Sequence, residues 1–129
     1  MTDPQWPDAV FAITLFCEDL AASRQFYRTV LAAEPHWGDE VSSVFRAGTT
    51  MINLLHVSAV DALIAPTAMA GPGVRAVYTL QVPSVDAIAD RLQDAGLVLM
   101  NGPMDRPWGI RTISLQDPSG HVWEMSQPI

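Results

Sequence analysis

The stretch Val10-Phe11-Ala12-Ile13-Thr14-Leu15-Phe16 is rich in β-branched and aromatic residues and predicts a β-strand. Asp19 follows it as a candidate helix N-cap. Behind Asp19, apolar residues recur at the spacing of one helix face, at Leu20, Phe26, Tyr27, Val30 and Leu31. Pro35 ends this helix, and short extended segments follow around residues 36–37, 41–46 and 51–57. The first half of the chain therefore predicts a strand, a helix and three further strands.

The same order recurs after residues 65–75, a segment rich in Pro, Ala and Gly that predicts a linker. Residues 76–82 predict a strand, Ser84 a helix N-cap, and Gly96 the end of that helix. The helix has an apolar stripe at Val85, Ile88, Ala89, Leu92 and Ala95. Further strands are expected at residues 97–100, 110–116 and 121–126. Asp117-Pro118-Ser119-Gly120 predicts a type I turn between the last two, because Pro is favoured at the second turn position and Gly at the fourth.

The two halves align on their first strands. Placing residues 11–15 over residues 76–80 puts Asp19 over Ser84, so the two helix caps coincide. We therefore predict an α+β fold with two copies of a strand, helix and three-strand module, residues 10–64 and 76–129, joined by the linker at 65–75. A length of 129 residues leaves room for one domain, residues 1–129. The alternative is an ordinary α+β domain in which the repeat is a coincidence.

Composition argues against several classes of partner. The chain has 7 basic residues, all arginine, against 14 acidic ones, and a net charge of −7 with scattered arginines argues against nucleic-acid binding. The same charge favours a cationic small molecule. No apolar run reaches the roughly 18 residues of a membrane span, and the first residues lack the features of a secretory signal. Cys17 is the single cysteine, which fits a cytoplasmic protein and predicts a small, inert strand residue.

Residues near both ends of the chain carry a resemblance to a known family. These are Leu15, Asp19-Leu20, Phe26-Tyr27, Pro107-Trp108-Gly109-Ile110-Arg111, Asp117-Pro118-Ser119-Gly120-His121 and Glu124. In this pattern the sequence resembles the vicinal oxygen chelate superfamily, which contains glyoxalase I, the extradiol dioxygenases and the bleomycin resistance proteins. The segment 107–111 ahead of Asp-Pro-x-Gly resembles the bleomycin resistance branch. The resemblance implies two βαβββ modules that form a half-open, eight-stranded, barrel-like cup with a ligand on its concave wall, and a homodimer.

The resemblance also implies where a metal would bind. Metal-dependent members take one ligand each from the first and fourth strand of each module, and the corresponding residues here are Ala12, Asn53, Val77 and Glu124. Only Glu124 is a typical ligand, and divalent transition metals need about three to four imidazole, thiolate or carboxylate groups. An alignment shifted by two residues offers Thr14, Leu55 and Thr79, which are no better. We expect no resident metal and no other cofactor, with a divalent metal as the alternative.

Glu124 stands between apolar neighbours, where a carboxylate is costly unless it faces water, a partner or a ligand. It is either a solvated edge residue, a partner for a cationic ligand, an inherited metal ligand or a general base. Trp108 is either a core residue or a flat surface on which an aromatic or cationic ligand stacks. Arg111 pairs either with Glu124 or with an anionic group of the ligand. The candidate ligand-binding residues are Phe16, Asn53, Leu55, Thr79, Met104, Trp108, Arg111 and Glu124.

The histidines and the first tryptophan give weaker signals. His36, His56 and His121 do not share a spacing that would bring two of them together on one element. Strand alternation points His56 away from Asn53, towards a structural role, and His121 is expected in solvent after the turn glycine. The segment 3–7 cannot form regular structure, so Trp6 is expected to anchor this arm on the body or on a second subunit.

The sequence supports competing hypotheses about function. The first is a metal-free binding protein, not an enzyme, that sequesters an aromatic or cationic small molecule in the cup and so confers antibiotic resistance, as the resemblance to bleomycin resistance proteins implies. The second is a lyase, isomerase or dioxygenase with an atypical metal centre in which Glu124 is catalytic. The third is a structural or regulatory dimer that has lost its ligand.

Overall fold

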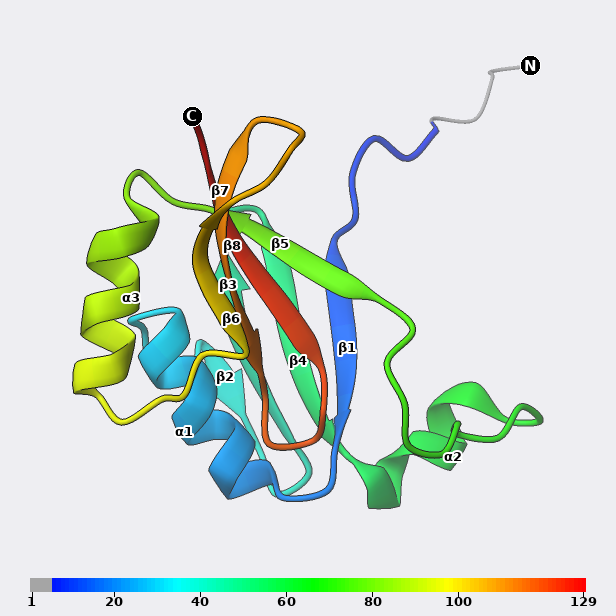
Figure 1. Ribbon diagram of the computed structural model, residues 1–129. Coiled ribbons are helices and arrows are strands. Elements are labelled where there is room, and N and C mark those ends of the chain that lie inside the picture. Colours follow the sequence, from blue (N-terminus) through cyan, green and yellow to red (C-terminus); the bar gives the residue numbers. More distant parts are fainter. Residues whose placement is uncertain (1–5) are drawn as a thin grey trace.

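The computed structural model describes residues 6–129, and its first half builds one sheet (Figure 1). The elements are β1 (Ala12–Cys17), α1 (Leu20–Val30), β2 (Trp37–Gly38), β3 (Ser42–Ala47) and β4 (Thr50–His56). A 3-10 turn at Val57–Ala59 and the short helix α2 (Val60–Ile64) follow. The sequence patterns did not predict this helical segment, because residues 57–64 have no apolar periodicity longer than one turn.

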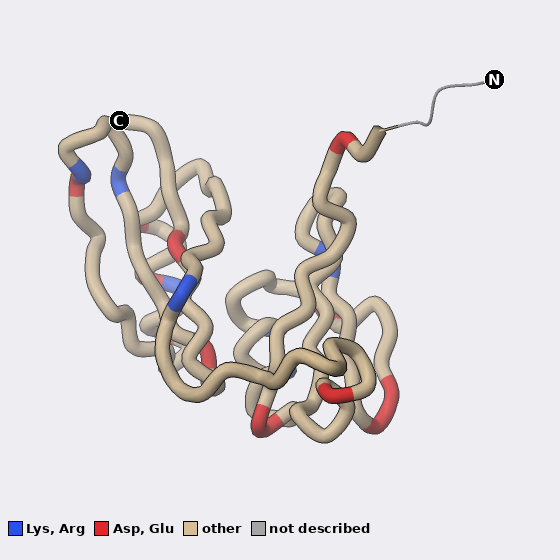
Figure 2. Tube along the Cα trace, turned by 90° about the vertical axis from the view of Figure 1, so that its right-hand side faces the viewer, with Lys and Arg blue, Asp and Glu red and all other residues tan. Residues whose placement is uncertain are grey.

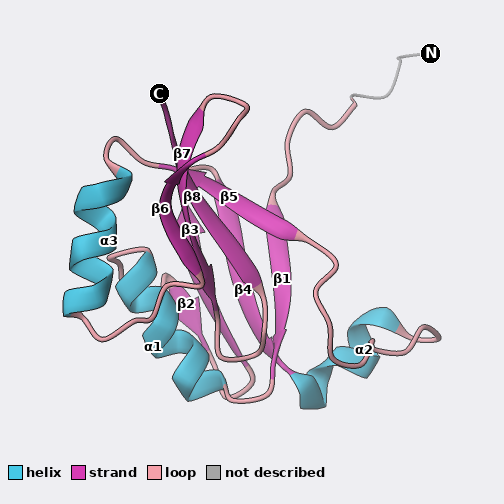
Figure 3. Cartoon of the chain, in the orientation of Figure 1, coloured by secondary structure: helices cyan, strands magenta, loops and turns pink. Residues whose placement is uncertain are grey.

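The second half repeats the order (Figure 3). Its elements are β5 (Val77–Gln81), α3 (Val85–Asp94), β6 (Asn101–Asp105), β7 (Ile110–Gln116) and β8 (Val122–Pro128). The two sheets have equivalent strand orders, β1-β4-β3-β2 and β5-β8-β7-β6. In each sheet the first strand runs parallel to the last, and the other neighbours are antiparallel. The predicted α+β class with two βαβββ modules is confirmed, and the two sheets do not close into a barrel.

Both predicted helix caps are present. Asp19 accepts a hydrogen bond from the backbone N–H of Ala22 at 3.0 Å, and Ser84 accepts one from the N–H of Ala87 at 3.2 Å. Each bond satisfies one of the N–H groups that a helix leaves free in its first turn. The two modules therefore start their helices in the same way, as the alignment of the halves predicted.

Helices α1 and α3 lie on the same side of the molecule (Figure 1) and pack on one face of each sheet. Side chains alternate along a strand, so every second residue points into this core. In β1 the inward residues are Ile13, Leu15 and Cys17, and in β8 they are Trp123 and Met125. The opposite face of each sheet bears no helix, and we call it the open face. It is the face on which the resemblance places a ligand.

A buried hydrogen-bond network joins the two halves. The hydroxyl of Tyr27 on α1 donates to Asp117 Oδ2 at 2.6 Å and accepts from the Trp123 indole N–H at 2.8 Å. Burial would raise the pKa of Asp117, but hydrogen bonds from His121 and Tyr27 hold it below its ordinary value. Burial next to that carboxylate raises the pKa of Tyr27, which keeps its proton. The Phe-Tyr and Asp-Pro-x-Gly segments that carry the resemblance are therefore in direct contact.

One predicted strand is misplaced. Residues 97–100 form a loop, and β6 begins only at Asn101. Leu97 and Leu99 are half-buried against the core, so their alternation reflects packing of a loop rather than a strand. Gly102 explains the close approach of β6 to β7, because a Cβ atom built on it would lie 2.3 Å from the carbonyl oxygen of Thr112.

Candidate functional site

The middle of the second open face holds a hydrogen-bonded carboxylate. Strand register places Thr79, Glu124 and Ser114 side by side on β5, β8 and β7. The Thr79 hydroxyl donates to Glu124 Oε1 at 3.1 Å. Glu124 is half-buried, and within residues 6–129 it has no ion-pair partner within 4.0 Å. A carboxylate in this position can pair with a cationic group of a ligand.

A guanidinium group lies on the same open face, nearer the β6–β7 turn. Arg106 donates from Nε to Thr112 Oγ1 at 3.0 Å and from Nη2 to Asn101 Oδ1 at 3.4 Å. Its guanidinium carbon lies 5.8 Å from the centre of the Trp108 ring, which is 67% exposed. In the described part of the chain, Arg106 has no carboxylate partner. Trp108 is therefore a surface residue and not part of the core.

The sequence analysis did not select Arg106, although a usable signal existed. In β7 the polar residues Thr112, Ser114 and Gln116 alternate with the buried Ile113 and Leu115. This alternation places the polar side chains on one face of β7. Buried hydroxyl groups on that face need a hydrogen-bond partner, because such groups are almost always hydrogen-bonded. Arg106 supplies that partner for Thr112.

The first open face holds neutral groups at the equivalent place. Thr14 and Asn53 are register partners, and Asn53 Nδ2 donates to Thr14 Oγ1 at 3.4 Å. Asn53 Oδ1 is buried and has no hydrogen-bond partner among the described residues. Phe16 and Leu55 are the next pair along the same face.

The four strand residues that correspond to the metal ligands of related proteins do not offer the donor atoms that a metal needs. Ala12 and Val77 carry no donor, Asn53 is a neutral amide, and Glu124 is the single charged group. Between residues 6 and 129, no group of three His, Cys, Asp or Glu side chains is placed to hold an ion. Transition metals bind through about three to four such ligands. The chain's own residues therefore do not fit the metal of the metal-dependent members.

Arg111 does not lie on the open face, and its predicted pairing with Glu124 is wrong. It pairs with Asp86 of α3 at 3.1 Å and with Asp105 at 2.9 Å, on the helix side of the sheet. Hydrogen bonds from Arg111 to Asp105 and Asp86 raise its pKa. The physical reason is alternation along β7: Arg111 precedes Thr112, which faces the opposite way.

The other predicted ligand-binding residues are spread along the open faces. Asn53, Thr79 and Glu124 lie in the middle, Phe16 and Leu55 at one end, and Met104 and Trp108 at the opposite end near the β6–β7 turn. Figure 2 shows the two halves diverging from the segment that joins them, with basic positions scattered over both. The structure thus brings two pairs of the eight predicted residues into register, Phe16 with Leu55 on the first sheet and Thr79 with Glu124 on the second.

A pocket of about 590 Å³ lies at the end of the sheets where residues 69–76 cross from one half to the other. Of the predicted residues, only Phe16 lines it. His121 also lines it, and the expectation that His121 is solvated is wrong: its side chain is 24% exposed and its Nδ1 lies 2.8 Å from Asp117 Oδ2. The β7–β8 turn folds back on Asp117, because the backbone N–H groups of Ser119 and His121 both donate to its carboxylate.

The remaining candidates have structural roles or none. His56 caps the 3-10 turn through Ser58, as the expected structural role requires, and His36 is exposed. Burial raises the pKa of the Cys17 thiol to about 11, so it is an inert strand residue. Trp6 is 82% exposed and is not anchored on the body, while residues 3–5 of the arm lie outside the described residues. Across residues 6–129 no helix is long and apolar enough to cross a membrane.

Comparison with known proteins gives the family. The chain is similar to a glyoxalase/bleomycin resistance protein/dioxygenase from Nocardioides, with 23% identity, a TM-score of 0.81, and coverage of 98% of this chain and 87% of that one. It is also similar to a lactoylglutathione lyase from Agrobacterium tumefaciens, with 25% identity, a TM-score of 0.72 and coverage of 93% of each chain.

In sequence, 64 residues are 36% identical to an uncharacterized protein of Mycobacterium bovis, and they span 50% of this chain and 41% of that protein. The chain therefore covers less than half the length of this relative. Residues 9–125 match the family described as the Glyoxalase/Bleomycin resistance protein/Dioxygenase superfamily. With nearly the whole chain matched and the fold in agreement, the protein belongs to the glyoxalase/bleomycin resistance protein/dioxygenase superfamily.

Proposed function

We propose that this protein binds a cationic, partly aromatic small molecule on its open faces without a resident metal, in the manner of the bleomycin resistance branch of its superfamily. The observation that carries the proposal is Glu124: a half-buried carboxylate that accepts one hydrogen bond from Thr79 and has no cation beside it among residues 6–129. Desolvating a charge without a partner is costly, so a cationic ligand gains a favourable pair at this point.

Two further features support this ligand class. Trp108 is a large exposed aromatic surface, and an aromatic or cationic group that stacks on such a ring gains about 0.5–2 kcal/mol. The net charge of −7 attracts cations to the protein as a whole. Sequestration of such a compound would make the protein a resistance factor, and we place it in the cytoplasm on the grounds of its single cysteine.

The ligand class is tested with a matched pair of compounds. Proflavine is a planar aromatic cation, and acridone is a neutral ring system of similar size and shape. The proposal expects proflavine to bind in isothermal titration calorimetry and acridone to bind at least tenfold more weakly. Equal affinities would contradict the pairing of Glu124 with a cation, and the absence of binding across a wider panel of cationic aromatics and glycopeptides would contradict the function.

We also propose that the protein acts as a homodimer. The apolar residues Trp6, Val10 and Phe11 of the N-terminal arm are mostly exposed in one copy, and a second copy would cover them. Analytical ultracentrifugation tests this: the wild-type chain should sediment as a dimer, and the double variant Trp6→Ala, Phe11→Ala should shift towards monomer. A monomeric wild-type chain at all concentrations would contradict it.

The rival function is a lyase with an atypical metal centre at Glu124. It is favoured by the similarity to the Agrobacterium protein described as lactoylglutathione lyase. Elemental analysis of protein purified without chelators separates the two functions. A stoichiometric amount of Zn, Ni, Mn or Fe that is lost in Glu124→Gln would favour the lyase.

A further inference from the structure

We propose that the pocket at the crossing segment 69–76 is a second small-molecule site, at one end of the open faces and separate from Glu124. It takes an uncharged molecule of one or two rings that carries a single hydroxyl or N–H donor, and His121 Nε2 accepts that donor.

The imidazole of His121 is held in one orientation by Asp117. The Asp117 carboxylate has four donors: Oδ1 accepts the backbone N–H groups of Ser119 and His121, both at 2.9 Å, and Oδ2 accepts Tyr27 and the His121 ring. The side chain of Asp117 is fully buried. An imidazole fixed by such a carboxylate has a defined direction for its second nitrogen.

The same contacts decide which ring nitrogen carries the proton. Hydrogen bonds hold the pKa of Asp117 below its ordinary value, so it is an ionised, acceptor-only group at neutral pH. The Nδ1 atom of His121, 2.8 Å from Oδ2, must then be the donor. In the neutral imidazole this leaves a lone pair on Nε2, which no group in residues 6–129 uses. In that neutral form the free atom is a hydrogen-bond acceptor.

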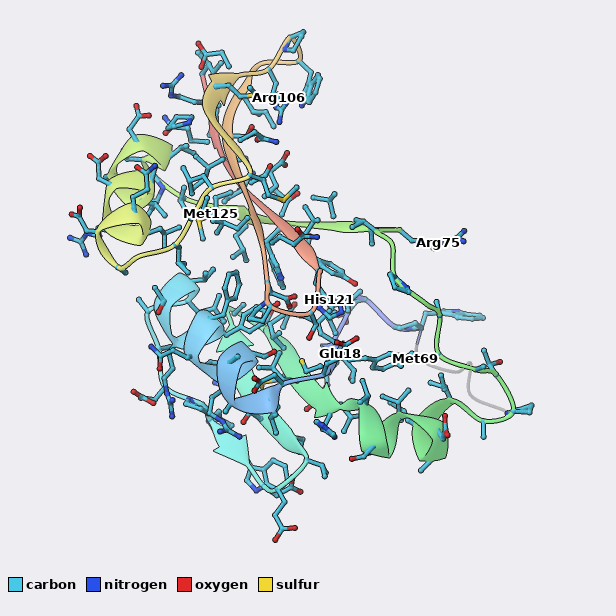
Figure 4. All side chains as sticks on the ribbon, turned by 60° about the horizontal axis from the view of Figure 1, so that its bottom comes forward. Glu18, Met69, Arg75, Arg106, His121 and Met125 are labelled. Carbon is cyan, nitrogen blue, oxygen red and sulfur yellow. The ribbon has the colours of Figure 1, made fainter. Side chains whose placement is uncertain are left out.

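The pocket around His121 has the size and lining of a ligand site. Its volume of about 590 Å³ is within the range of about 300–1,000 Å³ that is usual for small-molecule pockets. Apolar and aromatic walls come from Phe16, Met69 and Tyr78. The polar and charged side chains of the lining are Glu18, Arg75, Gln116, Ser119 and His121. Figure 4 shows Glu18, Met69 and His121 close together, from the end of β1, the crossing segment and the β7–β8 turn. The proposed ligand places its ring between the apolar walls and its donor at Nε2.

This pocket is distinct from the site around Glu124. His121 precedes Glu124 by three residues along the chain, which corresponds to about 10 Å in an extended strand. Glu124, Thr79 and Arg106 do not line the pocket. The inference therefore stands or falls independently of the proposed function.

The probes are 2-naphthol and 2-methoxynaphthalene, which share a ring system and differ in the hydroxyl donor. Heteronuclear NMR titration of the full chain should show 2-naphthol shifting the amide signals of residues 69–76 and 116–122. 2-Methoxynaphthalene should bind about fivefold to tenfold more weakly, as the loss of one hydrogen bond predicts.

Two substitutions of His121 test the roles of its two ring nitrogens separately. In His121→Asn the amide N–H₂ group replaces Nδ1 and keeps the bond to Asp117, but no atom replaces Nε2. In His121→Gln the amide reaches the former position of Nε2 and its oxygen retains the acceptor there. The Asn variant should lose the fivefold to tenfold preference for 2-naphthol, whereas the Gln variant should keep part of it. His36→Gln, an exposed histidine outside the pocket, is the matched control and should bind as the wild type does.

Several outcomes would overturn the site. They are equal binding of the two probes by the wild type, an undiminished preference in His121→Asn, or shifts confined to the residues around Glu124. If His121→Asn fails to fold, Met69→Glu tests the same pocket from the crossing segment, since Met69 takes no part in the hydrogen bonds of the Asp117 network. It should weaken both probes at least tenfold, and unchanged binding would contradict the location.

Discussion

The open faces of the two sheets hold equivalent pairs of residues with different chemistry. The alignment of the two halves places Thr14 over Thr79. Thr14 lies beside Asn53 in the first sheet, and Thr79 lies beside Glu124 in the second. In the first pair the amide donates to the hydroxyl, and in the second the hydroxyl donates to the carboxylate. The same backbone position therefore supports a neutral pair in one half and a charged pair in the other.

This difference shows which part of each module determines the chemistry of its open face. The parallel pairing of the first and last strand of each module fixes the place of the pair, because register partners on one face lie about 5 Å apart. The residue at that place then decides what is bound. Only the second half presents a charge there, so we expect ligand recognition to depend mainly on the second sheet.

The Tyr27–Asp117 bond joins the two halves within their shared hydrophobic core, and the largest effect is expected from weakening it. Asp117→Asn removes the charge that four donors surround. Hydrogen bonds to a charged group contribute about 1.5–3 kcal/mol each, so the free energy of unfolding should fall by about 3 kcal/mol. Urea denaturation followed by tryptophan fluorescence measures it. The matched control is Asp19→Asn, which keeps a good N-cap and should change the free energy by less than about 0.5 kcal/mol.

Acid provides a second measurement of the same bond. The pKa of Asp117 is lower in the folded chain than its ordinary value of 3.8, so its contribution is complete above that value and is lost as the pH falls further towards the folded pKa. The wild-type chain should therefore lose stability between about pH 4 and pH 2, and Asp117→Asn should lose less over this range. Parallel acid curves for the two proteins would show that Asp117 does not join the halves in this way.

The next largest effect is expected when the Thr79–Glu124 pair is made neutral, like the Thr14–Asn53 pair. Glu124→Gln keeps the size of the side chain and removes its charge. The affinity for proflavine should fall about thirtyfold, or about 2 kcal/mol, because a half-buried charge pair is lost. Asp90→Asn removes an exposed carboxylate on α3 and should leave the affinity unchanged. An equal loss in both variants would mean that only the net charge of the protein attracts the cation.

Giving the Thr14–Asn53 pair a charge, like the Thr79–Glu124 pair, should lower the stability of the fold. In Asn53→Asp a carboxylate replaces an amide whose oxygen is buried without a partner. Thr14 can reverse its hydroxyl and donate one hydrogen bond, but no cation compensates the charge, so the free energy of unfolding should fall by about 1–2 kcal/mol at pH 7. The loss should shrink at low pH as the new carboxyl group takes up a proton. A variant as stable as the wild type would show that the first open face accepts a charge as readily as the second.

The sequence was sufficient for the repeat but not for the site. Strand patterns, the caps at Asp19 and Ser84, and the turn at residues 117–120 depend on neighbours a few residues apart, and each is present in the structure. The predicted strand at residues 97–100 is wrong for a related reason: half-buried leucines in a loop alternate with exposed residues as they would in a strand. A local sequence pattern cannot distinguish such a loop from a strand.

Contacts between distant residues were beyond the reach of sequence patterns. Arg111 was expected near Glu124, yet α3 brings Asp86 to it from 25 residues away. His121 was expected in solvent, yet its ring bonds to Asp117, which Tyr27 reaches from the other half of the chain. The identity of each partner depends on how two modules pack, and no spacing along the chain records that.

The smallest effects are expected from the two threonines, and they distinguish the pairs most finely. Thr79→Val removes the donor to Glu124, and Thr14→Val removes the acceptor for Asn53, with no change of shape. The proflavine affinity should fall by about twofold to tenfold in Thr79→Val and not at all in Thr14→Val, because a hydrogen bond to a partly exposed group contributes about 0.5–1.5 kcal/mol. Calorimetric titration of both variants beside the wild type measures this. A larger loss in Thr14→Val than in Thr79→Val would place the ligand on the first sheet and reverse the assignment of roles to the two open faces.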